Sequence, residues 1–175
     1  LIPVHLGGQP SEQKKIWSLS RKYKFKILED ASHSIGAKHF GEPVGSCKWS
    51  DITVFSFHPV KIITTGEGGA ITTNDIELAR KLRILRSHGI TRDKEEMISK
   101  AHGDWYYQQL FLGFNYRLTE IQAALGMSQL KRLRKFIVKR EEISKIYNRE
   151  LSSLPLTIPK QKNYVKSSRH LYIVR

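Results

Sequence analysis

A short apolar run that ends in histidine and proline places the strongest constraint on the fold of this chain. Residues 52–57 are β-branched, aromatic or small, which predicts a buried strand. The run stops at His58-Pro59, because proline cannot donate to a central ladder. Lys61 follows on a loop rich in small residues, at the strand end where ligands bind in α/β folds. A solvated loop lysine would leave the same pattern.

A second strand ends in a carboxylate. Residues 25–30 predict a strand that closes with Asp30. Two strand ends, one carrying Asp30 and the next carrying Lys61, favour a pyridoxal 5'-phosphate (PLP) site. Lys61 would form the Schiff base, and Asp30 would keep the pyridine nitrogen protonated so that the ring acts as an electron sink. On the residues alone, Asp30 is equally compatible with a cap on the following turn.

Several short motifs occur in order along the chain, and together they resemble the DegT/DnrJ/StrS family of PLP-dependent sugar aminotransferases. The resemblance covers essentially the whole chain. It implies an α/β fold of the type I PLP-dependent transferases (aspartate aminotransferase-like), with a mostly parallel central sheet and a helix that links to a small domain. Residues 1–130 would belong to the large PLP-binding domain, and residues 131–175 would form the linking helix and the start of the small C-terminal domain. The motifs are Glu29-Asp30-Ala31-Ser32-His33, Ser56-Phe57-His58-Pro59-Val60-Lys61, Gly66-Glu67-Gly68-Gly69, Arg86-Ser87-His88-Gly89 and Gly113-Phe114-Asn115-Tyr116-Arg117-Leu118.

The resemblance also implies a role for each candidate site residue. Lys61 would carry the Schiff base and then move the proton, and Asp30 would pair with the pyridinium N–H. His33 would approach the ring oxygen of the cofactor, and Ser56 would donate its hydroxyl to the phosphate. Asn115 would reach the cofactor phosphate of the neighbouring subunit, which makes the active site a property of a homodimer. A structural histidine and a buried strand serine remain the alternatives for His33 and Ser56.

Other residues in these motifs receive no chemical role. His58 and Arg117 stand beside the motifs, and the glycines at 66–69 are expected to permit backbone conformations rather than to bind ligands. Cys47 is expected to be a small buried or loop residue, not a nucleophile. No metal site is implied.

The amino-acid sequences of residues 54–61 and of Trp105-Tyr106-Tyr107 are similar to those of family members that act on a UDP-linked sugar. The implied reaction is amino transfer from L-glutamate to a UDP-linked 4-keto-6-deoxy N-acetyl amino sugar, in pseudaminic acid biosynthesis. One alternative is a truncated, catalytically inactive or regulatory member of the same fold. Another, of a different class, is a basic nucleic-acid-binding domain.

The charge balance of the chain favours acidic partners. The sequence has 30 Lys+Arg against 16 Asp+Glu, a net charge of +14, which suits a nucleotide sugar and a phosphate cofactor as well as nucleic acid. No basic groove interleaved with aromatic residues is visible, and the densest basic segment, 131–135, predicts a solvated helix face. We therefore expect no nucleic-acid partner.

A cytoplasmic protein without a membrane partner is expected. No apolar run approaches the ~20 residues that span a bilayer, and the first residues do not resemble a signal peptide. A single cysteine excludes an internal disulfide and fits a reducing compartment.

Local patterns predict the remaining elements. We expect a helix capped by Ser11, a helix capped by Asn74-Asp75, and a long loop at 90–109. A helix from about Thr119 is expected to continue, with a bend or break near residues 132–135, to about Tyr147. Strands are expected at 1–6 and 170–175, and because both ends open or stop within a pattern, the chain resembles an internal fragment of a longer family member. We expect these residues alone to be inactive.

Overall fold

The computed structural model describes all residues, 1–175, and divides them into two compact units. One unit contains residues 1–74 and 120–175, and the other contains residues 75–119. Each unit is described by itself.

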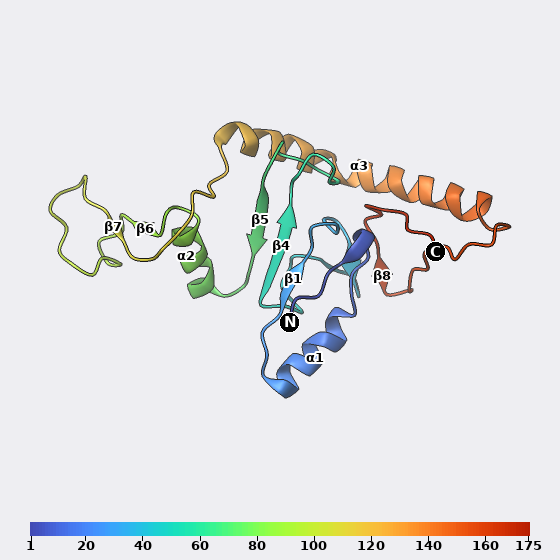
Figure 1. Cartoon of the computed structure of the whole chain (residues 1–175), viewed down its shortest axis with the longest axis horizontal. Helices are drawn as coiled ribbons and strands as arrows, with labels where there is room; N and C mark the ends of the chain where they lie inside the picture. Colours follow the sequence, from blue (N-terminus) through green and yellow to red (C-terminus); the bar gives the residue numbers. More distant parts are fainter. The chain divides into compact units, whose positions relative to one another are not determined.

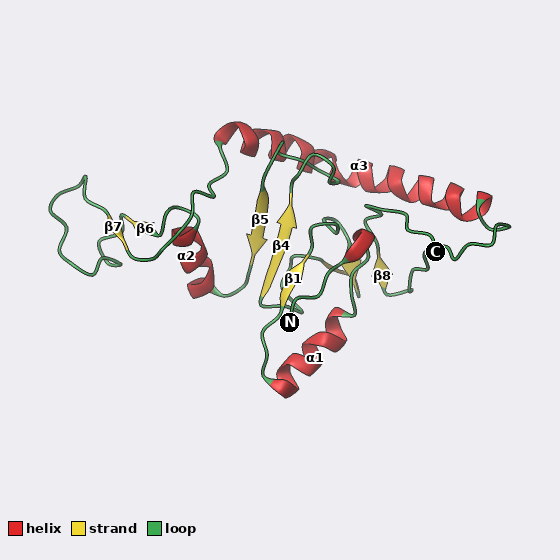
Figure 2. Ribbon diagram, in the orientation of Figure 1, coloured by secondary structure: helices red, strands yellow, loops and turns green.

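The first unit is built on a three-stranded sheet in the order β1-β4-β5 (Figures 1 and 2). Strand β1 (Leu28–Asp30) runs parallel to β4 (Ile52–Ser56), and β5 (Gly69–Thr72) pairs with β4 in the antiparallel sense. This arrangement agrees with the predicted α/β class. It also brings the carboxyl ends of β1 and β4 to the same edge of the sheet, as the candidate site requires.

Strand β4 forms where its residues predict it. Its side chains alternate between the two faces, so that Thr53 and Phe55 are buried. Phe55 packs in a core with Ala31, Ala37 and Val44, and Ile35 lies against this cluster. Burial of this apolar surface is the main force that holds β4 beside β1.

The predicted strand at residues 1–6 is wrong, although its position beside β1 is right. Only Val4 forms a bridge, parallel to Asp30. The carbonyls of Leu1 and Pro3 accept hydrogen bonds from β1 at 3.1 and 3.0 Å, and the His5 N–H donates to the Asp30 carbonyl at 3.0 Å. Because Pro3 has no N–H to donate, the ladder stays incomplete, and the chain turns into a 3-10 helix, η1 (Leu6–Gly8).

The predicted strand at residues 170–175 is also wrong. The segment has no strand partner, and its backbone is held at two points. The Leu171 N–H donates to the Gly7 carbonyl at 3.2 Å, and Arg175 exchanges two hydrogen bonds with Thr157. The strand pairing at this end of the chain occurs earlier, at β8 (Val165–Lys166).

Helix α1 and a second sheet complete this part of the unit. Helix α1 (Gln13–Tyr23) begins two residues after Ser11, which is not its cap; Glu12 occupies that position and makes no capping hydrogen bond through its side chain. The second sheet is antiparallel in the order β3-β2-β8, with β2 at Lys38–His39 and β3 at Glu42–Pro43. Phe40 and Gly41 form the tight turn between β2 and β3, and both have positive φ.

Helix α3 (Glu120–Glu150) continues past residues 132–135 as predicted, without the break that was given there as one alternative to a bend. That stretch is rich in lysine, arginine and leucine, whose straight or γ-branched side chains lose little freedom in a helix, and it contains neither glycine nor proline. Figure 1 shows α3 running past the end of the sheet toward which β4 points. Despite its length, neither this helix nor any other is apolar enough to cross a membrane.

The second unit holds a short helix and a two-stranded ladder. Asp75 caps α2 (Ile76–Leu85), since its Oδ1 accepts the Leu78 N–H at 3.0 Å, which confirms the predicted cap. The segment predicted as a long loop is irregular except for one antiparallel pairing of β6 (Ile90–Thr91) with β7 (Gln108–Gln109).

A buried carboxylate lies next to the candidate site on β1. Glu29 is 1% exposed, and its Oε2 accepts hydrogen bonds from Thr53 Oγ1 at 2.9 Å and Ser50 Oγ at 3.1 Å. Gln13 Nε2 donates to Oε1, and His5 Nε2 lies 3.7 Å from the same oxygen. Burial alone would raise the pKa of Glu29, but these hydrogen bonds and His5 hold it below its usual value. The network joins the N-terminal segment, α1 and both central strands.

Glu29→Gln should therefore destabilise the chain strongly. The amide replaces one of the two carboxylate oxygens with an NH2 group, so a donor faces either Gln13 or the Ser50 and Thr53 hydroxyls, and the charge is lost; we expect a loss of roughly 2–4 kcal/mol. Urea unfolding measures the loss. Glu42→Gln is the matched control, because Glu42 pairs with Lys48 at the surface and should contribute at most about 1 kcal/mol. Equal stability of the two variants would contradict the network.

Candidate active site

The loop after β4 is a turn that places Lys61 at the edge of the sheet. The Lys61 N–H donates to the His58 carbonyl at 2.9 Å, so residues 58–61 form a turn with Pro59 at its second position, where a fixed φ is favoured. The next two residues, Ile62 and Ile63, are buried at 6% and 3% exposure. The turn is thus anchored by strand β4 on one side and by apolar burial on the other, and Lys61 is half-buried between them.

The loop that follows is fastened to the end of β4 through Phe57. The Phe57 carbonyl accepts from Thr64 Oγ1 at 2.9 Å and from the Thr65 N–H at 3.0 Å, and the Phe57 N–H donates to the Gly68 carbonyl at 2.7 Å. Gly69 must lie close to this strand, since a Cβ there would come within 2.6 Å of the Phe55 carbonyl oxygen. The glycines therefore shape the loop around Lys61.

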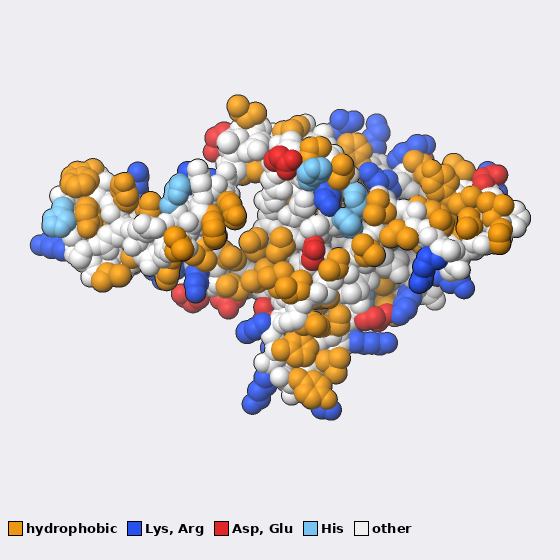
Figure 3. Space-filling model, in the orientation of Figure 1, with side chains coloured by type: hydrophobic (Ala, Val, Ile, Leu, Met, Phe, Trp, Pro, Cys, Tyr) orange, Lys and Arg blue, Asp and Glu red, His pale blue; other side chains and the backbone are white.

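Asp30 and His33 reach the same edge from β1. The Ala31 N–H donates to the Val54 carbonyl at 2.9 Å, which keeps the end of β1 beside β4. The Asp30 side chain accepts the Ser32 N–H at 3.0 Å through Oδ1. The charge of Lys61 acts on both Asp30 and His33, so the three predicted residues are brought together. Figure 3 shows histidine and basic side chains gathered between β4 and α3, with acidic side chains nearby.

The electrostatics suit an ionised Asp30 and a neutral His33. Burial by itself would raise the pKa of Asp30, but hydrogen bonds from Ser32 and the charges of His33 and Lys61 hold it below its usual value. Burial, and then the charge of Lys61, lower the pKa of His33, while Asp30 opposes them. Lys61 Nζ makes no hydrogen bond or ion pair within the chain, so its amine is free for chemistry.

Ser56 is the last residue of β4, and its hydroxyl is only weakly engaged. Its Oγ accepts the His58 N–H at 3.4 Å, which leaves the hydroxyl proton available to donate. His58 itself is occupied by the loop, because its Nδ1 accepts the Val60 N–H at 3.3 Å and its Nε2 lies 3.8 Å from Glu67 at the surface. Asn115 lies in the other compact unit, is exposed, and pairs through its backbone with Ser87.

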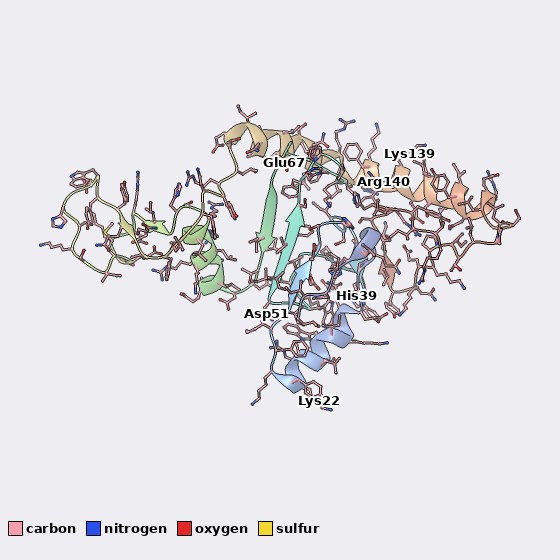
Figure 4. All side chains as sticks on the ribbon, in the orientation of Figure 1. Lys22, His39, Asp51, Glu67, Lys139 and Arg140 are labelled. Atoms are coloured by element: carbon pink, nitrogen blue, oxygen red, sulfur yellow. The ribbon has the colours of Figure 1, made fainter.

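Two residues at this edge are not predicted from the sequence. The His170 ring lies 4.5 Å from the His33 ring, and Arg140 on α3 donates to the His170 carbonyl at 3.2 Å. Figure 4 shows Arg140 on α3 next to Lys139. His170 also lines a cavity of about 160 Å³ between α3 and the C-terminal segment, together with Ser144 and Tyr172. No local signal links residues 33, 140 and 170, because a sequence pattern carries no information on contacts so far apart in the chain.

Cys47 has the structural role that was expected. The side chain is buried, and its Sγ lies 3.2 Å from the Thr72 carbonyl, with no base beside it to activate the thiol. No group of metal-ligating side chains is present among the residues of the structure.

The fold and the paired strand ends are those of the type I PLP-dependent transferase class. The sequence profile of the DegT/DnrJ/EryC1/StrS aminotransferase family matches residues 1–175, and the chain belongs to this family. The chain spans less than half the length of the curated relatives that it matches.

Two relatives bear on the kind of aminotransferase. The chain is 43% identical over 170 residues to the UDP-4-amino-4,6-dideoxy-N-acetyl-beta-L-altrosamine transaminase of Campylobacter jejuni, covering 97% of this chain and 42% of that protein. The structure of Helicobacter pylori PseC, an aminotransferase of pseudaminic acid biosynthesis, superposes with a TM-score of 0.86 at 37% identity, covering 99% of this chain and 44% of that one. The resemblance to PseC is also visible in the amino-acid sequence of residues 54–61.

A further solved relative identifies the cofactor of the family. The sugar aminotransferase Spr1654 of Streptococcus pneumoniae has been solved in a PLP form and in a pyridoxamine phosphate (PMP) form, with TM-scores of 0.85 and 0.87. The two forms cover 99% of this chain and 47% and 48% of that protein, at 30% and 29% identity. Aminotransferases of this family thus depend on pyridoxal phosphate.

Proposed function

We propose that this chain supplies the cofactor-binding edge of a PLP-dependent sugar aminotransferase. The observation that carries the proposal is the convergence of Asp30, His33 and Lys61 at the carboxyl ends of β1 and β4. Membership of an aminotransferase family supports it. The division into a PLP-binding part at 1–130 and a linking helix with the start of a small domain at 131–175 belongs to the same proposal.

The residues present fit PLP. The Lys61 amine has no partner in the chain, so it can bind the aldehyde carbon of the cofactor. Asp30 is half-buried and ionised, which suits a partner for a pyridinium N–H. The free hydroxyl proton of Ser56 suits a phosphate oxygen. A metal or flavin would need other groups.

Each residue then has a definable task. Bound PLP supplies a carbonyl carbon for amino groups and a pyridinium ring that withdraws electrons. Asp30 keeps the ring nitrogen protonated through its negative charge. Lys61 Nζ would remove the proton from the amino-bearing carbon of the donor and pass it to the cofactor in the first half-reaction, and in the second it would move a proton from the cofactor to the acceptor carbon. Ser56 holds the phosphate, and so fixes the cofactor relative to Lys61.

The substrate is proposed to be a UDP-linked 4-keto-6-deoxy N-acetyl amino sugar, with L-glutamate as amino donor, in pseudaminic acid biosynthesis. The names of the relatives in Campylobacter jejuni and Helicobacter pylori support this choice. The net charge of +14 is compatible with an anionic nucleotide sugar. A cytoplasmic location, where nucleotide sugars are made, completes the proposal.

The test is an amino-transfer assay. Because the relatives are longer than this chain, the assay uses the protein encoded by the complete open reading frame, with PLP, L-glutamate and the UDP-linked keto sugar. Formation of the UDP-linked amino sugar, followed by mass spectrometry, is the expected result. Cofactor binding without any amino product from this or related UDP and GDP keto sugars would favour the inactive or regulatory alternative.

The site is proposed to be shared between two subunits, with Asn115 reaching the partner's cofactor phosphate. Mixing inactive Lys61→Ala subunits with inactive Asn115→Ala subunits should then restore up to roughly a quarter of the wild-type activity, because one site of each mixed dimer contains both intact residues. Turnover after subunit exchange measures the recovery. No recovery, with exchange confirmed by native mass spectrometry, would place both residues of a working site in one chain.

A further inference from the structure

His33 is held on two sides by segments that lie far from it in the sequence. Its Nδ1 accepts the Gly7 N–H at 3.3 Å, and its backbone carbonyl accepts from Ser168 Oγ at 3.1 Å. The His170 ring packs on it at 4.5 Å with an angle of 42° between the ring planes. We call Gly7, Gly8, Ser168 and His170 the His33 seat.

The members of the seat are fixed to one another. The Ser168 N–H donates to the Gly8 carbonyl at 3.0 Å, and Ser168 is fully buried. Gly8 admits no side chain, since a Cβ there would meet Ser168 Oγ at 2.7 Å and the His170 nitrogen at 2.8 Å. The position of His170 therefore follows from close backbone contacts with η1, not from packing of its own side chain alone.

Helix α3 fixes the other side of His170. Arg140 donates through Nη1 to the carbonyls of Arg169 and His170, each at 3.2 Å. Arg169 is fixed as well, because its Nε donates to Glu141 at 3.0 Å. The C-terminal segment thus cannot carry the His170 ring away from His33 without breaking contacts to two elements.

The hydrogen bond from Gly7 sets the tautomer of His33. A backbone N–H can only donate, so Nδ1 must be the bare nitrogen and a neutral ring carries its proton on Nε2. The groups that face His33 are Lys61, Asp30 and the His170 ring; burial and then the charge of Lys61 lower the pKa of His33, and Asp30 opposes them. Nε2–H is left to donate to an acceptor at the site.

We propose that His170 is a positioning residue, whose ring packs on His33 and keeps its Nδ1 on the Gly7 N–H, so that the proton on Nε2 can be donated to an anionic oxygen of the bound cofactor. This inference rests on the proposed function for its ligand. The ring of His170 must be neutral for this role, because a protonated His170 ring would be a second cation near Lys61 and the two charges would repel each other. Burial, then His33, Lys61 and Arg140, lower the pKa of His170 to about 4, so the ring is uncharged at neutral pH.

The first experiment measures the tautomer of His33 in the absence of cofactor. In the full chain labelled with ¹⁵N-histidine, imidazole shifts distinguish a bare nitrogen from a protonated one, and His33→Gln identifies the His33 signals. The wild type should show a single Nε2–H form. His170→Leu should give a mixture of tautomers, and the pKa of His33 should rise toward its usual value because the ring becomes hydrated.

A matched variant separates the role of the ring from general loss of structure. His170→Phe keeps an aromatic ring and should leave the His33 signals close to those of the wild type. Because a cavity borders His170, leucine and phenylalanine have room to settle, and near-ultraviolet circular dichroism checks the fold. His33 signals that stay unchanged in folded His170→Leu would overturn the proposal.

The second experiment adds PLP to the protein encoded by the complete open reading frame. His170→Leu should weaken PLP binding about 3- to 10-fold, the value of one lost hydrogen bond, with a shift in the visible absorption of bound PLP. His170→Phe should lose less. Equal PLP affinity and equal spectra for wild type and His170→Leu would overturn the proposal, whereas failure of the wild type to bind PLP would contradict the proposed function and leave the tautomer result to stand on its own.

Discussion

Lys61→Ala should abolish amino transfer and leave the fold intact. Lys61 Nζ makes no hydrogen bond or ion pair within the chain, so its removal costs little stability. It would remove the group that we propose binds the cofactor covalently and moves the proton. We expect turnover in the full-length protein to fall by at least about 10,000-fold. Borohydride reduction of the PLP-loaded protein, followed by peptide mass spectrometry, should find the label on residue 61 in the wild type and nowhere in the variant.

Lys139→Ala is the control for this prediction. Lys139 lies on α3 and pairs with Glu142 at the surface, so its loss should change neither labelling nor turnover (Figure 4). Covalent labelling of Lys61→Ala at another lysine, with turnover preserved, would show that a different residue binds the aldehyde.

Asp30→Asn should keep PLP bound but slow turnover by roughly 100- to 1,000-fold. The amide retains the shape and the hydrogen-bonding reach of the side chain but lacks the charge that is proposed to keep the ring nitrogen protonated. Because the pKa of Asp30 is lowered in the folded chain, the wild-type carboxylate stays charged throughout the neutral range. The defect should therefore be nearly constant between about pH 6 and 9.

Cofactor binding and turnover must be measured separately for this variant. Equilibrium titration with PLP gives the affinity, and single-turnover kinetics with L-glutamate give the rate of the first half-reaction. Asp104→Asn, at a site 98% exposed, should match the wild type in both measurements. Rapid turnover of Asp30→Asn at full cofactor occupancy would show that Asp30 does not have the proposed role at the ring nitrogen.

The sequence predicts those parts of the fold that local chemistry decides. β-branched and aromatic residues define β4, the proline after His58 ends it, and Asp75 caps α2 as expected. The two strand ends that carry Asp30 and Lys61 could be placed side by side because β1 and β4 are parallel neighbours. The limits of β4 and the cap of α2 depend on residues close together in the chain, whereas the pairing of β1 with β4 joins Leu28 to Ile52.

The errors occur where distant partners decide the structure. Residues 1–6 and 170–175 have strand-like composition, but a strand needs a ladder, and neither segment finds a complete one. The seat of His33 could not be foreseen, because it is made by residues from both ends of the chain. The helix does not break at residues 132–135, since helix propensity there is high.

Helix α3 also has a consequence for motion. Gln122 on its first turn donates to the Glu67 carbonyl at 3.1 Å. Arg140, about 27 Å further along the helix axis, donates to the carbonyl of His170. Between them, Ile137 lies so close to Gly36 that a Cβ there would come within 2.1 Å of it. Because α3 is one continuous helix that contacts the loops at Gly36, Glu67 and His170, we expect the motions of these loops to be correlated. Amide hydrogens in residues 65–68 and 168–171 should consequently exchange with one common opening free energy, that of α3 leaving the edge of the sheet.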